Sequence, residues 1–202
     1  KTAAELEEAI QQLGATINVV SGTEDIRVRV NTLAKNYDAT LALLEEILFE
    51  PRWDTKEFDL AKQGVISQIR QQEANPNAIA QNQYNLLLHG KDNIRSRNTL
   101  GTVDSVNRIS IDGIKAFYTR AMSPSVSRLH IVGAIDNSKA IASLKTIEKR
   151  WAAKKVEFPK IPVSAPPTKA QVYFYDVPDA KQSVIRFGYP ALAATDPDFY
   201  PA

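Results

Sequence analysis

Hydrophobic and polar residues alternate with two different periods along the chain, which predicts a mixture of helices and strands. The clearest strand signal is Ile26, Val28 and Val30, because a polar residue separates each from the next. A β-rich stretch at 15–20 precedes them, and residues 21–25 have the composition of a turn. We therefore expect a β-hairpin within residues 15–33.

Apolar residues at helical spacing occupy most of the remaining chain. Thr2 and Glu5 have the spacing of a capping box, which predicts a helix that begins there and ends at Gly14. Pro51 and the pair Asn75-Pro76 predict the ends of two later helices, since proline cannot continue a helix. The further expected helices cover residues 37–50, 54–73, 77–88, a short one from Thr102 or Asp104, 111–122, and one from Asn137 with Ile141, Leu144, Ile147 and Trp151 inward.

The C-terminal part of the chain changes character. Residues 125–135 are expected to form a strand, whereas the prolines within 156–169 favour an extended linker. Beyond them, residues 172–175 and 183–187 predict two strands around a Pro178-Asp179 turn. We therefore expect one α+β domain over residues 1–155, a linker over 156–169 and the start of a second domain over 170–202.

The composition removes several kinds of site. The 202 residues include no Cys and 2 His, which excludes a disulfide framework, a thiolate nucleophile, a Cys-ligated metal and a His-rich zinc site within this sequence. The 25 basic and 23 acidic side chains leave a net charge of +2, which argues against a surface dedicated to nucleic acid. No apolar run approaches the roughly 18 residues of a membrane span, and the first residues do not resemble a signal peptide.

Few side chains combine into a candidate active site. The motifs of serine hydrolases, phosphate loops and dinucleotide-binding folds are absent from the sequence. His89 precedes Gly90 at a predicted helix end, where a cation complements the helix dipole. His130 is interpreted as an ordinary histidine of the predicted strand. Arg27 and Arg29 share one strand face, for which a solvent-facing row is favoured over a ledge for an anionic ligand.

Two positions on the expected 54–73 helix are informative. Ala61 and Gln68 lie two turns apart on one face, beside the apolar stripe. Two carboxylates at this spacing can present their oxygens to one buried site. A neutral amide carries no charge to offset Zn²⁺, however, and alanine offers no ligand. No catalytic and no metal-binding residue is therefore assigned in this chain.

The order of these elements resembles the insulinase/pitrilysin family of zinc metallopeptidases, which includes the mitochondrial processing peptidases. Three stretches carry the resemblance: residues 5–19 around Gly14, residues 37–53 with their closing Pro-Arg-Trp, and residues 62–76 with their closing Asn-Pro. Gly101-Thr102 and the later strand and helix also fit. The resemblance covers nearly the whole chain and rests on the ordered set rather than on one motif.

The resemblance implies a fold and a metal site. Family members contain two or more similar α+β domains that close like a clamshell, each with an antiparallel sheet covered on one face by helices. Active domains bind zinc through an inverted His-x-x-Glu-His motif and a Glu on a later helix, and the motif's own Glu activates the attacking water. Here the motif is absent, the later Glu matches Gln68, and the second acidic position matches Ala61. The domain over residues 1–155 is thus expected to lack its first strand and its metal helix.

The resemblance also implies a role. We expect a fragment of a non-catalytic half, which completes the substrate chamber of an active half or subunit. Zinc is then expected only in that active partner, and no cofactor is expected in this chain. Two alternatives stay open: an active zinc endopeptidase whose His-x-x-Glu-His helix lies upstream of Lys1, and a scaffold without a proteolytic role.

Substrate and location follow from the same resemblance. In active members the strand after the metal helix pairs with an extended peptide by adding a β-strand. That strand maps to Ile17, Asn18 and Val19, which fit an ordinary sheet strand equally well. No nucleic-acid partner and no membrane span are expected. Bacterial proteins of this kind are often periplasmic or attached to the cell envelope, so this location is expected, and the cytoplasm also fits.

Overall fold

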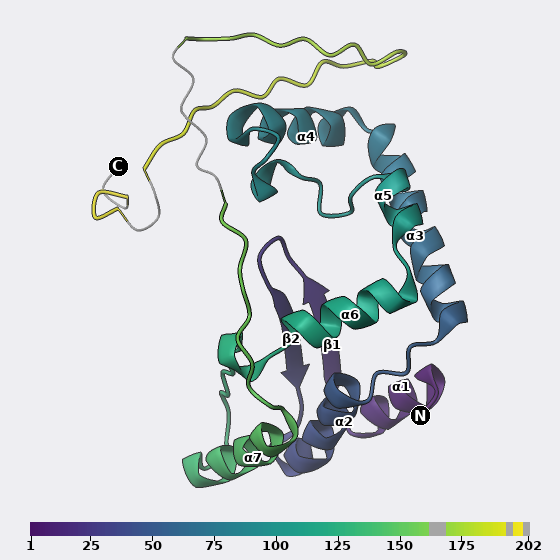
Figure 1. The fold of residues 1–202 in the computed structure, drawn as a ribbon, viewed down its shortest axis with the longest axis vertical. Helices are drawn as coiled ribbons and strands as arrows, with labels where there is room; N and C mark the ends of the chain where they lie inside the picture. The colour runs from purple at the N-terminus through teal and green to yellow at the C-terminus, as the bar shows by residue number, and fades with distance from the viewer. Residues whose placement is uncertain (162–168, 193–195, 200–202) are drawn as a thin grey trace. The chain divides into compact units, whose positions relative to one another are not determined.

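The computed structural model describes residues 1–161, 169–192 and 196–199. The chain divides into two compact units, one of Lys1–Phe58 with Ile109–Phe158 and one of Asp59–Arg108 with Pro159–Ala202. Helices and one small antiparallel sheet make up the fold, so the expected α+β class is confirmed (Figure 1). The elements are α1 Ala3–Gln12, β1 Thr16–Ser21, β2 Ile26–Asn31, α2 Tyr37–Phe49, α3 Thr55–Glu73, α4 Pro76–His89, α5 Val103–Arg108, α6 Ile111–Ala121 and α7 Asn137–Arg150, with 3₁₀ turns η1 Ala34–Asn36, η2 Ile94–Ser96 and η3 Pro124–Val126.

Local sequence signals set the helix ends. The capping box of α1 is formed: Thr2 Oγ1 accepts from the Glu5 amide at 3.2 Å, and Glu5 Oε2 accepts from the Thr2 amide at 2.8 Å. The hydrogen bond from the Thr2 amide favours the carboxylate and is the main cause that lowers the pKa of Glu5. Gly14 adopts φ +57°, a left-handed conformation that glycine tolerates best, just after the helix. Pro76 begins α4, where its missing amide proton leaves no helical bond unmade.

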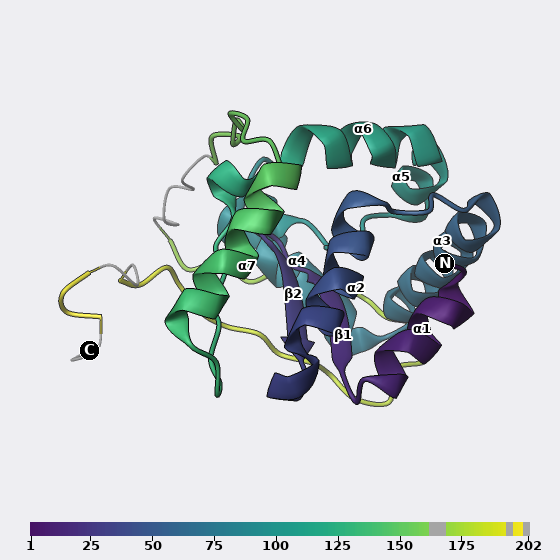
Figure 2. The same ribbon diagram turned by 90° about the horizontal axis from the view of Figure 1, so that it is seen from below.

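Helix α2 supplies the core of the first unit, and it lies between α1 and α7 and contacts both (Figure 2). Leu43 and Leu44 are buried, since the apolar stripe of an amphipathic helix turns away from water. The α7 contact is reinforced by charge: Arg150 Nη1 lies 2.9 Å from Glu45 Oε2, and its Nη2 lies 2.7 Å from Glu50 Oε1. The hydrogen bond to Glu45 is the main cause that raises the pKa of Arg150.

The second unit has a core of its own. Ile66 and Ile69 of α3 and Val106 of α5 form a buried cluster. Around it pack the half-buried side chains of Val65, Leu100 and Val103. In the same unit Asn98 Nδ2 donates to Gln72 Oε1 at 2.8 Å, which links the segment before α5 to the end of α3.

Three strand predictions are wrong. Residues 125–135 begin inside η3 and then carry no strand, and residues 172–175 and 183–187 carry none either. Alternating side chains predict a two-faced segment, but a strand also needs a hydrogen-bonded neighbour. Among the described residues only β1 and β2 have such a neighbour. Consistent with this, Val132 is 97% exposed.

Helix α7 and the predicted linker differ in part from the expectation. Ile141 of α7, predicted to point inward, is exposed, whereas Leu144, Ile147 and Trp151 are half-buried as expected. Within the predicted linker, residues 162–168 lie outside the described residues. None of the helices in the described ranges combines the length and apolar character needed to cross a bilayer.

Candidate functional site

The β1–β2 hairpin carries the three residues assigned to peptide binding. The strands are antiparallel, with Ile17 opposite Val30 and Val19 opposite Val28. Because the sheet has two strands, each keeps one edge to which no other described strand is hydrogen-bonded. Such an edge presents backbone donors and acceptors to an extended chain.

The turn of the hairpin determines which residues of β1 face outward. The Gly22 amide donates to Asp25 O at 2.8 Å, which makes these two residues a hydrogen-bonded pair. Hydrogen-bonded and non-hydrogen-bonded pairs alternate along an antiparallel ladder. The register therefore directs the N–H and C=O of Asn18 toward β2. Those of Ile17 and Val19 point toward the open edge.

Side chains give the hairpin one apolar and one polar face. Ile17 and Val28 are half-buried on the apolar face, where Val19 is 56% exposed. Asn18 lies on the opposite face and is exposed. This geometry can accept an added strand, and it also meets the requirements of a structural hairpin.

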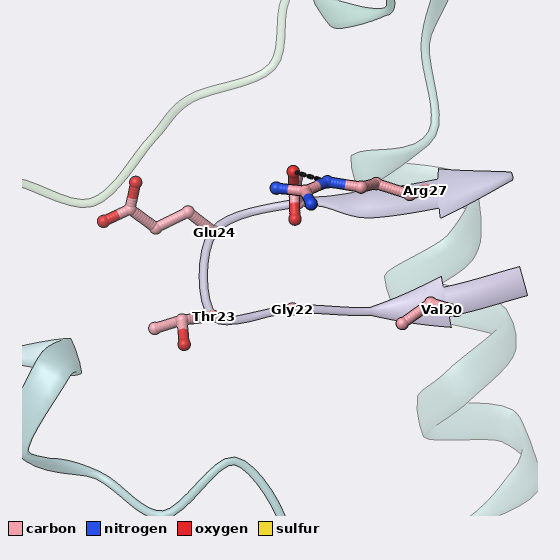
Figure 3. A pocket seen from close by; sticks show the side chains of 6 residues that line it. Val20, Gly22, Thr23, Glu24 and Arg27 are labelled. Atoms are coloured by element: carbon pink, nitrogen blue, oxygen red, sulfur yellow. Dashed lines mark hydrogen bonds and ion pairs between the residues drawn. The ribbon is translucent and has the colours of Figure 1, made fainter. Parts of the chain in front are cut away.

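The tip of the hairpin forms a shallow hollow of about 310 Å³ (Figure 3). Arg27 Nε lies 2.7 Å from Asp25 Oδ2, so the guanidinium is paired within the hairpin. Arg29 is exposed on the same strand face. Because Arg27 is already paired with Asp25, Arg27 and Arg29 fit a solvent-facing row better than a ledge for an anionic ligand.

Helix α3 of the second unit carries the two family-implied metal positions. Ala61 and Gln68 are both exposed, while the neighbouring Ile66 and Ile69 are buried. Within the described ranges, no group of three or more His, Cys, Asp or Glu side chains is placed to hold a metal ion. The side chains that α3 offers at these positions are an amide and a methyl group, a poor donor set for Zn²⁺.

The two histidines lie in different units. His89 occupies the last turn of α4, ahead of Gly90 with φ +76°, as the sequence predicts. His130 is exposed and lies in the stretch that carries no strand, so its assignment to a sheet is wrong.

Sequence reasoning missed the most organised aromatic cluster of the first unit. Trp53 contacts Tyr118 edge-to-face with centroids 5.6 Å apart, and Phe49 contacts Trp151 at 5.8 Å. The corner at Trp53 and the inward position of Trp151 are visible in the sequence. Nothing in the spacing places Tyr118 against Trp53, because the fold alone brings α6 to the end of α2.

Two protein-family models match the chain. The model described as Insulinase (Peptidase family M16) matches residues 1–93. The model described as Peptidase M16 inactive domain matches residues 108–202. Together with the α+β fold, these matches define the class: the chain belongs to the insulinase-type M16 peptidase family.

Similar proteins agree with this assignment. The chain is 23% identical over 155 residues to an uncharacterised zinc protease of Streptomyces coelicolor, covering 76% of this chain and 34% of the relative. It is 19% identical over 145 residues to an uncharacterised zinc protease of Mycobacterium leprae, covering 72% and 32%. The chain thus spans about a third of the length of these curated relatives.

Solved structures show the same fold. A peptidase M16 inactive domain from Pseudomonas fluorescens superposes with a TM-score of 0.75 at 20% identity, covering 83% of this chain and 40% of that one. The first half of the periplasmic protease PqqL from Escherichia coli gives a TM-score of 0.62 at 22% identity, covering 78% and 35%. At these identities the likeness concerns the fold.

Proposed function

We propose that the chain is part of a non-catalytic half of an insulinase-type peptidase and completes the substrate chamber of an active half or subunit. The observation that carries this proposal is the pair Gln68 and Ala61 on α3, where the resemblance implies acidic residues. The match of residues 108–202 to a model described as an inactive domain supports it. Substitutions at position 68 test the proposal. If the chain is non-catalytic, zinc binding by the full-length gene product is expected not to change when Gln68 is replaced by Ala or Glu.

The proposal includes a domain arrangement and a location. In this arrangement residues 1–155 form the peptidase-family domain and residues 170–202 begin the next domain. Residues 156–169 are the linker between them. Zinc resides only in the active partner. A periplasmic or envelope location is supported by the fold shared with PqqL, which is a periplasmic protease.

The open edge of β1 is the proposed contact for an extended peptide. Ile17 and Val19 offer their backbone groups outward, and the exposed Val19 side chain can pack against the incoming strand. Asn18 contributes through its exposed side chain, since its backbone bonds to β2.

Val19→Pro is expected to weaken peptide binding about fivefold, because one backbone hydrogen bond contributes about 1 kcal/mol. Proline removes an outward N–H and leaves the ladder to β2 intact. Fluorescence anisotropy with a labelled Val/Thr-rich decapeptide measures the change in the full-length product. Val19→Thr keeps both the N–H and the β-branch, so it serves as the matched control. Equal affinity of the Pro and Thr variants would rule out strand addition at this edge.

A second candidate is an active zinc endopeptidase whose His-x-x-Glu-His helix precedes Lys1. It is favoured by the names of the curated relatives, both zinc proteases, of which this chain spans about a third. The codons that precede Lys1 in the gene discriminate the two candidates: an intact motif supports the active enzyme, and its absence supports the non-catalytic half.

A further inference from the structure

The first unit contains a groove of about 460 Å³, lined by the end of α2, the α2–α3 connection, α6 and the segment after α7. Aromatic and apolar side chains dominate its lining: Leu48, Phe49, Pro51, Trp53, Met122 and Trp151. No residue of the hairpin lines it, so the groove is distinct from the open edge of β1. Its volume lies within the range of about 300–1,000 Å³ typical of ligand pockets.

The groove is held in shape before anything binds. Trp53 and Tyr118 meet at an interplanar angle of 81°, and Phe49 and Trp151 meet at 70°. The Tyr118 hydroxyl donates to Leu48 O. Burial raises the pKa of Tyr118, so the hydroxyl keeps its proton and remains a donor. A rigid lining of this kind lowers the entropic cost of binding.

Backbone strain at Trp53 is an independent observation at the same place. Its φ is +52°, in the left-handed region that bulky residues rarely occupy. Such strained backbone gathers at ligand clamps and active sites. The indole of this strained residue contacts Tyr118 and lines the groove.

Charge at the groove has one sign. Lys115 and Lys154 line it, and no Asp or Glu does among the described residues. Lys115 Nζ makes a 3.3 Å contact with Asp112, whose side chain is 86% exposed. No described carboxylate lies within 4.0 Å of the Lys154 ammonium. The Lys154 backbone is anchored, since its amide donates to Ser123 Oγ at 3.0 Å.

We propose that this groove is a docking site for an acidic segment of a protein partner. The segment inserts one aromatic or long apolar side chain between the two ring pairs. Its carboxylates lie beside Lys115 and Lys154, so that charge complementarity selects the partner. The proposal does not depend on whether the chain belongs to a catalytic or a non-catalytic half.

Fluorine NMR of the full-length product labelled with 5-fluorotryptophan tests the docking site, because Trp53 and Trp151 both line the groove. Trp53→Phe and Trp151→Phe assign the two resonances. The probe is acetyl-Glu-Phe-Glu-amide, with acetyl-Lys-Phe-Lys-amide and acetyl-Glu-Ala-Glu-amide as matched comparators. Both resonances are expected to shift saturably with the first probe, and the comparators are expected to bind about fivefold more weakly or worse.

Three variants test whether the peptide binds in the groove and whether the charge of Lys154 contributes. Ala152→Leu fills the groove from an exposed lining position and is expected to abolish the shifts. Lys154→Gln is expected to weaken binding several-fold, whereas Lys145→Gln, an exposed lysine of α7 outside the lining, leaves it unchanged. Equal shifts with all three peptides, or no saturable shift, would overturn the proposal. Benzoate binding as tightly as the peptide would also overturn it, in favour of a small-molecule site.

Discussion

Ile69→Ala is expected to destabilise the second unit by about 3 kcal/mol, because deleting buried methyl and methylene groups loses transfer free energy and leaves a cavity. Ile69 is 2% exposed and packs with Ile66 and Val106 in the buried cluster. The side chain lies between α3 and α5, so its loss weakens the contact that joins them. No other apolar side chain of this cluster is as deeply buried.

Native-state hydrogen exchange of the α3 amides measures this loss within the full-length product. Leu60→Ala is the matched control, since Leu60 lies on the same helix and is 67% exposed. The control is expected to change stability by less than about 0.5 kcal/mol. Similar exchange rates in the two variants would contradict the packing of α3 against α5.

Ser123→Ala is expected to cost about 2 kcal/mol of stability in the first unit, because a buried donor left without an acceptor loses its full desolvation energy. Ser123 is 0% exposed. Its Oγ accepts from the Lys154 amide at 3.0 Å and donates to Lys154 O at 2.9 Å. This serine thus pins the segment after α7 to the end of α6.

Ser125→Ala is the control for that substitution. Ser125 is exposed, and its Oγ donates to the same Lys154 carbonyl without satisfying the amide. Its loss is therefore expected to cost less than about 0.5 kcal/mol. Hydrogen exchange of the Lys154 amide provides the readout: it accelerates in Ser123→Ala, and equal acceleration in both variants would refute the proposed bond.

The helices could be predicted because their signals are local. The capping box of Thr2 and Glu5 and the Asn75-Pro76 break act within one turn of the chain, so no distant residue alters them. The hairpin is also local, since its alternating strands are joined by a short turn around Gly22.

The failed strands show where local information ends. Residues 125–135 alternate well enough to suggest a strand, but pairing depends on a neighbour that the sequence pattern does not identify. The same limit applies to Tyr118, whose contact with Trp53 joins α6 to the α2–α3 connection. Helical spacing alone places positions 61 and 68 on one face, whereas their correspondence to metal positions comes from the resemblance to the peptidase family.

The dependence of zinc affinity on position 68 tests the non-catalytic assignment most directly. Chelator competition with the full-length product compares the unmodified chain, Gln68→Ala, Gln68→Glu and the double variant Gln68→Glu with Ala61→Glu. For a non-catalytic half we expect either no stoichiometric zinc or a zinc affinity that is the same in all four proteins. A tenfold or larger loss with Gln68→Ala, or an equal gain with Gln68→Glu, would place α3 in a working metal site and contradict it.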